Sequence, residues 1–346
     1  MKNYEDLIIL NNLKTVCLIG HSNADADSLA SMVVFKNFLI NHFKVEQVDL
    51  FADDSIITNT YSEFISNTEI NNSPLEHYDA AIMLDTAKVE KLGNYKNLFN
   101  QSKIKINIDH HNTNEQSGNI NIIEQISSTS ELIFKICKHF NYKLSTEECG
   151  MLYAGIITDT NNLTVGNFND ETFAIISEFI NDINHEEIYN HFFNNNSLTN
   201  MKLLARAINN ISAYENDEII ITHIKEDDLL ALNATHFDLV GIINRIATIN
   251  TAKLVCFIYP QNNLYYVSMR GRKGFSVAEI AKKHNGGGHL GAAAFNSNQN
   301  IDEISKLILQ EFKTVLNKTQ FKPIKCFTPK YSENSCSKAF VFGPRM

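Results

Sequence analysis

Several features are scarce in this chain, and each absence narrows its class. Its 346 residues include six cysteines but no C-x-x-C pair, and most of the cysteines lie in apolar runs. That pattern argues against both a zinc-thiolate site and a disulfide framework. No apolar run is long enough to span a bilayer, and the first residues lack the pattern of a secretory signal. We therefore expect a cytoplasmic protein without a membrane segment.

Positive charge is also in short supply. Lysine and arginine number 30 against 39 acidic residues, which gives a formal net charge of -9. A protein that binds duplex DNA without regard to sequence needs a basic surface, so we expect no duplex DNA as a partner. The chain is 44% hydrophobic and 20% charged, as ordinary globular proteins are, and its length allows about two domains.

The stretch Gly20–Ser31 joins a short apolar run, suited to a buried strand, to an apolar helical pattern. His21, Asp25 and Asp27 are therefore expected in a strand-to-helix turn, where open α/β sheets bind ligands. Two carboxylates in one such turn repel each other unless a cation lies between them. The alternative is a simple helix start with Asp27 or Ser28 as its N-cap.

Strands and helices alternate through the first half of the chain, which predicts a doubly wound parallel α/β sheet. Further strands are expected at 47–51, 78–84 and 104–108, and helices at 128–140 and 146–158. Two of these strands end on Asp85-Thr86 and Asp109-His110-His111, and the second helix ends near Asp159. Each of these segments alone could be a turn, a polar loop or a cap. Because acidic or histidine residues recur at the ends of three strands and one helix, a shared site is the stronger interpretation.

The second half of the chain predicts a smaller α/β domain. Helices are expected at 185–193 and 198–211, a strand at 219–223, a helix at 238–248, a strand pair at 254–258 and 264–269, and helices at 274–283 and 301–316. The predicted organisation is a first domain at 1–182, a helical linker at 183–214, a second domain at 215–318 and an unassigned tail at 319–346.

The motifs together resemble those of the DHH phosphoesterase superfamily. They are H-x-x-x-D-x-D-S at His21–Ser28, D-T at Asp85-Thr86, D-H-H at Asp109–His111 and G-I-I-T-D-T at Gly155–Thr160. Further on, Ser268-Met269-Arg270 and the G-G-G-H of Gly286–His289 resemble the DHH-associated C-terminal domain. The resemblance implies a DHH domain followed by a substrate-binding domain, with the active site in the cleft between them.

The resemblance also implies two divalent metal ions, Mn²⁺ first, with Mg²⁺ or Co²⁺ as alternatives, because mixed carboxylate and imidazole ligands suit such ions. The family pattern assigns six ligands and lets one of them bridge the two ions. The first ion takes His21, Asp25 and Asp85, and the second takes Asp27, Asp85, His110 and Asp159.

Catalytic and substrate-binding roles follow from the same resemblance. Asp109 is expected to orient His110, and His111 is expected to face the substrate. Substrate binding is assigned to Arg270, Gly286, Gly287, Gly288 and His289. A guanidinium fork suits a phosphate, and glycines let backbone N–H groups approach an anion. A solvated strand edge and a flexible loop are the alternatives for these two segments.

A chain of these two domains resembles the short-RNA nucleases, or nanoRNases, that also dephosphorylate 3′-phosphoadenosine 5′-phosphate (pAp). We expect hydrolysis of short oligoribonucleotides to mononucleotides, and of pAp to AMP. Cleavage of cyclic or linear dinucleotides such as c-di-AMP and pApA is the closest alternative, because it uses the same motifs. A catalytically silent nucleotide- or RNA-binding regulator is an alternative of another class. The expected partners are short RNA or small phosphorylated nucleotides, and a homodimer is left open.

Overall fold

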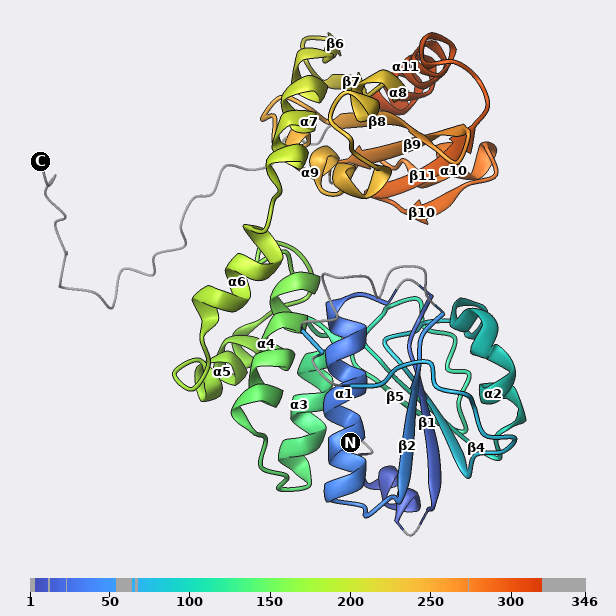
Figure 1. Ribbon diagram of the computed structural model, residues 1–346, viewed down its shortest axis with the longest axis vertical. Helices are drawn as coiled ribbons and strands as arrows, with labels where there is room; N and C mark the ends of the chain where they lie inside the picture. The colour runs from blue at the N-terminus through green and yellow to red at the C-terminus, as the bar shows by residue number, and fades with distance from the viewer. Residues whose placement is uncertain are drawn as a thin grey trace, which may run out of the picture. The chain divides into compact units, whose positions relative to one another are not determined.

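The computed structural model describes residues 4–11, 13–22, 24–53, 64–65, 68–272 and 274–318 (Figure 1). The chain divides into two compact units, Met1–Asn195 and Asn196–Met346, and each is described by itself below. Among the described helices, none combines the length and the apolar character that a bilayer crossing requires. The tail at 319–346, with Cys326 and Cys336, lies outside the described residues.

The first unit is a parallel sheet with helices on both faces, as the sequence predicts. Its strands run in the order β2-β1-β3-β4-β5, and every neighbouring pair is parallel. They are β1 (Thr15–Ile19), β2 (Gln47–Phe51), β3 (Ala80–Leu84), β4 (Ile104–Asp109) and β5 (Ile120–Ile123). The order reverses between β1 and β3, which is where doubly wound sheets bind ligands.

Helices α1, α3 and α4 lie on one face of this sheet and α2 on the other (Figure 1). The helical segments are η1 (Tyr4–Leu10), α1 (Ala26–Asn41), η2 (Val89–Tyr95), α2 (Lys96–Gln101), α3 (Thr129–His139), α4 (Thr146–Asp159), α5 (Asp170–Phe179) and α6 (His185–Phe193). Helix α1 is the centre of the core, because it packs against β1, α3 and α4 at once. Near its end the fully buried Phe38 meets the rings of Phe35, Phe43, Phe140 and Tyr142. This packing fixes the start of α1 beside the strand ends.

The second unit is a six-stranded sheet in the order β10-β11-β9-β8-β7-β6, antiparallel except for the parallel pair β7–β8. Its strands are β6 (Ser212–Tyr214), β7 (Ile219–His223), β8 (Leu254–Gln261), β9 (Leu264–Gly271), β10 (Gly287–His289) and β11 (Ala292–Ser297). Its helical segments are α7 (Leu198–Asn209), α8 (Glu226–Leu230), η3 (His236–Leu239), α9 (Ile242–Ile246), α10 (Ala278–Lys283) and α11 (Ile301–Lys318). One apolar cluster lies between the sheet and α10 and α11, and another beneath α7 and α9.

Three local predictions are corrected by this fold. The helix expected at 238–248 is two short pieces, η3 and α9, because Gly241 adopts a positive φ of 82° between them. The helix expected at 274–283 begins only at Ala278. Of the glycine triplet expected as a loop, Gly287 and Gly288 form the edge strand β10 together with His289, and Gly286 precedes the strand.

Candidate active site

The first candidate residues lie where β1 leads into α1. Asp25 is the N-cap of α1, and its Oδ1 accepts a hydrogen bond from the Ser28 N–H at 3.1 Å. The alternative that Asp27 or Ser28 caps this helix is therefore wrong, since Asp27 lies inside the first turn. Carboxylates are favoured at a helix N-terminus. His21 lies in the preceding turn, with its Nε2 3.9 Å from Asp25 Oδ2.

Asp27 is almost fully buried, at 1% exposure, and the start of α3 holds its carboxylate. The N–H of Thr129 donates to its Oδ2 and the N–H of Ser130 donates to its Oδ1, both at 2.8 Å. Burial raises the pKa of Asp27, and the bonds from Ser130 oppose that shift by stabilising the charged form. The Thr129 hydroxyl also donates to Asp85 Oδ1 at 3.0 Å, so one helix end contacts two candidate ligands.

In the sequence, Ser128-Thr129-Ser130-Glu131 has the form of a capping box at the start of a helix, and the capping of α3 differs from it in part. Ser128 accepts a hydrogen bond from the Glu131 N–H, as the pattern predicts. The Glu131 carboxylate does not return this bond, because its Oε2 accepts from the hydroxyls of Ser127 and Thr172 instead. Glu131 thereby ties the start of α3 to α5.

Asp85 follows β3 and adopts a positive φ of 53°, an uncommon conformation that Asp tolerates better than most residues. Its N–H donates to the Ile108 carbonyl at 3.0 Å, which anchors the strained residue to β4. The buried carboxylate lies between two imidazoles. His21 Nε2 is 3.5 Å from Asp85 Oδ2, and His110 Nε2 is 3.6 Å from Asp85 Oδ1. This is the placement that a carboxylate bridging two cations requires.

The D-H-H segment begins with the last residue of β4, Asp109, which is fully buried. Asp109 Oδ1 accepts from the main-chain N–H of His110 at 2.8 Å and from His111 Nδ1 at 2.7 Å, and its Oδ2 accepts from Asn114 at 2.6 Å. The expectation that Asp109 orients the His110 ring is wrong, because the Nδ1 of that ring lies 3.2 Å from the Ile126 carbonyl. Asp109 instead orients the His111 ring.

The contact between Asp109 and His111 shifts the pKa of both groups. Burial alone raises the pKa of Asp109, but the hydrogen bond and charge of His111, the bond from Asn114 and the charge of His110 together outweigh it and leave that pKa below its usual value. The same bond raises the pKa of His111 to about 9. The ring is therefore a cation at neutral pH, with Nδ1 facing Asp109 and Nε2 left for another partner.

His110 and Asp159 complete the cluster. Asp159 is the last residue of α4, and its Oδ2 lies 3.4 Å from His110 Nε2. That buried Nε2 has no hydrogen-bond partner among the described residues, although it is surrounded by carboxylates. An unpaired imidazole nitrogen facing acidic oxygens is the arrangement expected of a metal ligand.

The carboxylates of this cluster destabilise one another. Burial raises the pKa of Asp85, and the charges of Asp27 and Asp25 raise it further. Burial and Asp27 raise the pKa of Asp159 to about 7. Protons or cations must therefore neutralise part of the cluster, and divalent ions do so without protonating the ligands.

The structure brings the six predicted metal ligands together in two groups of three, which are linked by a further group that contains both Asp85 and His110. Ligand atoms within 4.8 Å of one another are offered by His21, Asp25 and Asp85 in one group, and by Asp27, His110 and Asp159 in another. A third group joins Asp85, Asp109, His110 and His111. The donor set of carboxylates and imidazoles fits Mn²⁺ or Mg²⁺ and contains no thiolate.

Gly155, in the fourth motif, lies where α4 crosses the start of α3. A Cβ atom at this position would come within 2.0 Å of Ser130 Oγ and 2.8 Å of Asp27 Oδ1. Helix α4 can therefore approach the carboxylate cluster this closely only because residue 155 has no side chain. One helical turn later the same helix delivers Asp159 to His110.

The predicted substrate-binding residues lie in the second unit. Arg270, near the end of β9, donates from Nε to Asn244 at 3.0 Å and from Nη1 to the Met269 carbonyl at 3.0 Å. Two of the glycines are required by packing, because a Cβ at Gly286 or Gly288 would overlap β11. Gly287 has open space around its Cα, and the side chain of His289 is outside the described residues.

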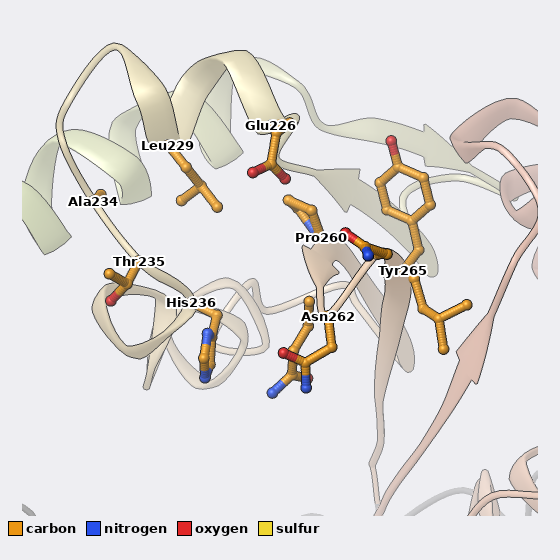
Figure 2. Close-up of a pocket in the computed structure, with 11 residues that line it drawn as sticks. Glu226, Leu229, Ala234, Thr235, His236, Pro260, Asn262 and Tyr265 are labelled. Atoms are coloured by element: carbon orange, nitrogen blue, oxygen red, sulfur yellow. The ribbon is translucent and has the colours of Figure 1, made fainter.

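A hollow of about 480 Å³ in the second unit contains none of the predicted site residues. Figure 2 shows it between α8, the segment around His236 and the turn that joins β8 to β9 at Asn262. Arg270 lies at the opposite end of the eight-residue strand β9. The hollow is therefore separate from the surface around Arg270.

Sequence reasoning missed the contacts that support the cluster. Thr129, Ser130 and Asn114 were not singled out, although each holds a buried carboxylate. The only available signal was the helix-start pattern at 128–131, which predicts where α3 begins and not which groups its N–H atoms meet.

Comparison with known families agrees with this geometry. Residues 15–156 match the model of the DHH family, N-terminal domain, and residues 189–314 match the DHHA1 domain. This chain belongs to the DHH family. The family resemblance inferred from its motifs is thereby confirmed.

Relatives of this DHH chain are named as oligoribonucleases and PAP phosphatases. It is 26% identical over 310 residues to the probable bifunctional oligoribonuclease and PAP phosphatase NrnA of Streptococcus mutans, covering 87% of this chain and 95% of the relative. It is 26% identical over 282 residues to the bifunctional oligoribonuclease and PAP phosphatase NrnA of Bacillus subtilis, covering 80% and 87%.

Solved structures show the same fold. An exopolyphosphatase-related protein from Bacteroides fragilis matches with a TM-score of 0.81 and 22% identity, covering 91% of this chain and 96% of the other. Exonuclease RecJ bound to manganese matches with a TM-score of 0.56 and 13% identity, covering 91% and 94%. These likenesses confirm the predicted fold class, a parallel α/β unit followed by a second α/β unit.

The carboxylate cluster predicts a metal-dependent gain in stability. Mn²⁺ should raise the melting temperature of the protein, since a ligand at a hundred times its dissociation constant adds about 2.7 kcal/mol to the free energy of unfolding. In EDTA, Asp85→Asn should have a higher melting temperature than the natural protein, because it removes repulsion among the clustered carboxylates. The variant should also lose most of the rise in melting temperature that Mn²⁺ causes. Differential scanning calorimetry with and without Mn²⁺ measures both, with the exposed Asp182→Asn as the control. A full Mn²⁺ shift in Asp85→Asn would contradict the bridging position.

The crossing of α4 over α3 predicts a matched pair of glycine variants. Gly155→Ala should lower the free energy of unfolding by about 1–3 kcal/mol through overpacking, and should weaken Mn²⁺ binding because Asp27 must shift. Gly150→Ala is the control in the same helix, since its Cβ would meet only Ile188 at 3.5 Å, and it should be neutral or stabilising. Denaturant unfolding and a Mn²⁺ titration compare them. Equal behaviour of the two variants would refute the role given to Gly155.

Proposed function

We propose that this DHH protein is a metal-dependent phosphoesterase that hydrolyses short oligoribonucleotides to mononucleotides and pAp to AMP. The observation that carries the proposal is the position of Asp85, which shares one ligand group with His21 and Asp25 and lies 3.6 Å from His110 of the other group. A carboxylate in this position can bridge two metal ions, and paired metal ions are used to hydrolyse phosphoesters. The names of its relatives support the choice of substrates. The intact ligand set argues against a catalytically silent regulator.

In this proposal the ligands divide as the family pattern assigns them. His21, Asp25 and Asp85 would hold one ion, and Asp27, Asp85, His110 and Asp159 would hold the other. When bound, two such ions supply charge neutralisation and activate the attacking water. Mn²⁺ is our choice for these oxygen and nitrogen donors, with Mg²⁺ or Co²⁺ as alternatives.

The protein's own groups position the ions and the substrate. The start of α3 keeps Asp27 and Asp85 in place through the N–H of Thr129, the N–H of Ser130 and the Thr129 hydroxyl. Asp109 holds Nδ1 of His111, so the Nε2–H of that ring is directed to a second partner. In our mechanism this N–H stabilises charge on the substrate phosphate or donates a proton to the leaving oxygen.

Substrate binding is assigned to the second unit. Arg270 would contact a phosphate through the guanidinium edge that its bonds to Asn244 and Met269 leave available. Gly287 and its neighbours Gly286 and Gly288 would offer backbone N–H groups, with His289 beside them. Cytoplasmic location and a homodimer stay predictions.

Loss of the shared ligand should abolish turnover. Asp85→Ala should lower the rate of pAp and dinucleotide hydrolysis by several orders of magnitude, because each of the two proposed ion sites would lose a ligand. Initial rates in Mn²⁺ buffer measure this loss, and Asp182→Ala provides an exposed acidic control. Near-normal rates for Asp85→Ala would mean that the chemistry lies elsewhere.

Substrate length should decide between related activities. The net charge of -9 offers few contacts to a long polyanion, so rates should be highest for di- to pentanucleotides and fall for longer strands. Initial rates on 5′-labelled RNAs from two to about twenty nucleotides, beside pAp and c-di-AMP, test this. Undiminished degradation of the longest strand would overturn the short-substrate proposal, and activity confined to dinucleotides would favour the dinucleotide alternative.

A further inference from the structure

The strand register of the second sheet places three rows of side chains on one face. The first row is Tyr259, Tyr266 and Asn296, from β8, β9 and β11. The middle row is Phe257, Ser268 and Ala294, and the third is Val255, Arg270 and Ala292. Neighbouring rows are two residues apart along a strand, which is about 7 Å.

Helices cover this face only in part. The apolar cluster beneath α7 and α9 takes in Val255 and Phe257 of β8 and borders Tyr259, but among the described residues it contains no member of β9 or β11. Tyr266 is partly exposed and Asn296 is exposed. The opposite face of the same strands is closed by α10 and α11. The ring of Tyr266 therefore lies between the part of this face that helices cover and the part that they leave exposed.

The two tyrosines of the first row form a fixed pair. Their ring centroids are 5.2 Å apart, and the ring planes are tilted by 38°. The ring centroid of Phe257 lies 5.0 Å from that of Tyr259. Burial raises the pKa of Tyr259, Tyr266 adds to that shift, and the charge of Arg270 partly opposes it. The guanidinium thus lies close enough to the ring pair to act on it electrostatically.

Arg270 is held toward the middle row. Its Nε bonds Asn244 of α9, and its Nη1 lies 3.4 Å from the hydroxyl of Ser268. On β9 and β11 the middle row has only the small residues Ser268 and Ala294, and a Cβ at Gly287, which pairs with Ala294, would meet nothing within 4 Å. A cation, a low floor and an aromatic ring follow one another along the sheet, in the order of the phosphate, sugar and base of one nucleotide.

We propose that Tyr266, backed by Tyr259, is a stacking platform for a nucleobase of a nucleotide whose phosphate contacts Arg270. The proposal rests on the proposed function, since it takes the substrate to be a nucleotide. Stacking on an aromatic side chain suits every base, because each has a π face. The platform therefore predicts affinity for nucleotides in general, with the exposed amide of Asn296 beside the base edge.

The absence of tryptophan from the chain allows a direct test by binding. Tyr266→Trp keeps an aromatic surface and makes a single fluorescent reporter, which AMP should quench in a saturable way and ribose 5-phosphate should not. Tyr265→Trp is the matched control, because Tyr265 is the preceding residue and faces the opposite side of β9. Absence of quenching in Tyr266→Trp, or equal quenching in both variants, would overturn the proposal.

A second measurement uses catalysis. Tyr266→Ala should raise KM for a dinucleotide roughly 5- to 150-fold with little change in kcat, and should leave KM for a dinucleotide with abasic sugars unchanged. Tyr266→Phe, which keeps the ring, should restore the normal KM. Equal losses on the normal and abasic substrates would refute stacking. If AMP quenches the fluorescence of Tyr266→Trp but the protein hydrolyses no phosphoester, the stacking platform is supported and the proposed function is rejected. Failure of the platform and failure of the proposed function are therefore distinguishable.

Discussion

Two backbone N–H groups at the start of α3 hold the buried Asp27 carboxylate, and the candidate metal centre is arranged around that contact. Burying a carboxylate is costly unless it is fully hydrogen-bonded, and a helix N-terminus provides the required donors. The Thr129 hydroxyl extends the contact to Asp85. Since α3 is also tied to α5 through Glu131 and Thr172, the helix layer around the site is connected to the ligands themselves.

The location of the site could be predicted from local pattern. Short apolar runs ending on His, Asp or D-H-H indicate strands that end at one sheet edge, and β1, β3 and β4 are parallel neighbours as this requires. The family resemblance then supplied the division of ligands into two sets. The structure brings the same residues within reach of one another, and their role as metal ligands stays a prediction.

The supporting contacts could not be predicted, because they join residues far apart in the chain or depend on backbone angles. The partner of Asp109 is the ring of His111 and not that of His110, and the choice is set by the Ile126 carbonyl, sixteen positions after His110. The positive φ of Asp85 and the break at Gly241 are likewise tertiary outcomes. Hydrophobic periodicity predicts helices and strands, but it does not predict which of two adjacent side chains, such as those of His110 and His111, contacts a buried group.

The second sheet has strands of three residues at both of its edges, β6 and β10, and strands of eight residues in its interior. Unpaired edges are templates on which other chains can add strands and aggregate, and very short edge strands are one way in which natural sheets limit that hazard. The glycines of β10 thus have a consequence beyond any ligand. They allow a short edge strand to pack closely on β11. This short edge protects the long strands β8 and β9 from pairing with other chains.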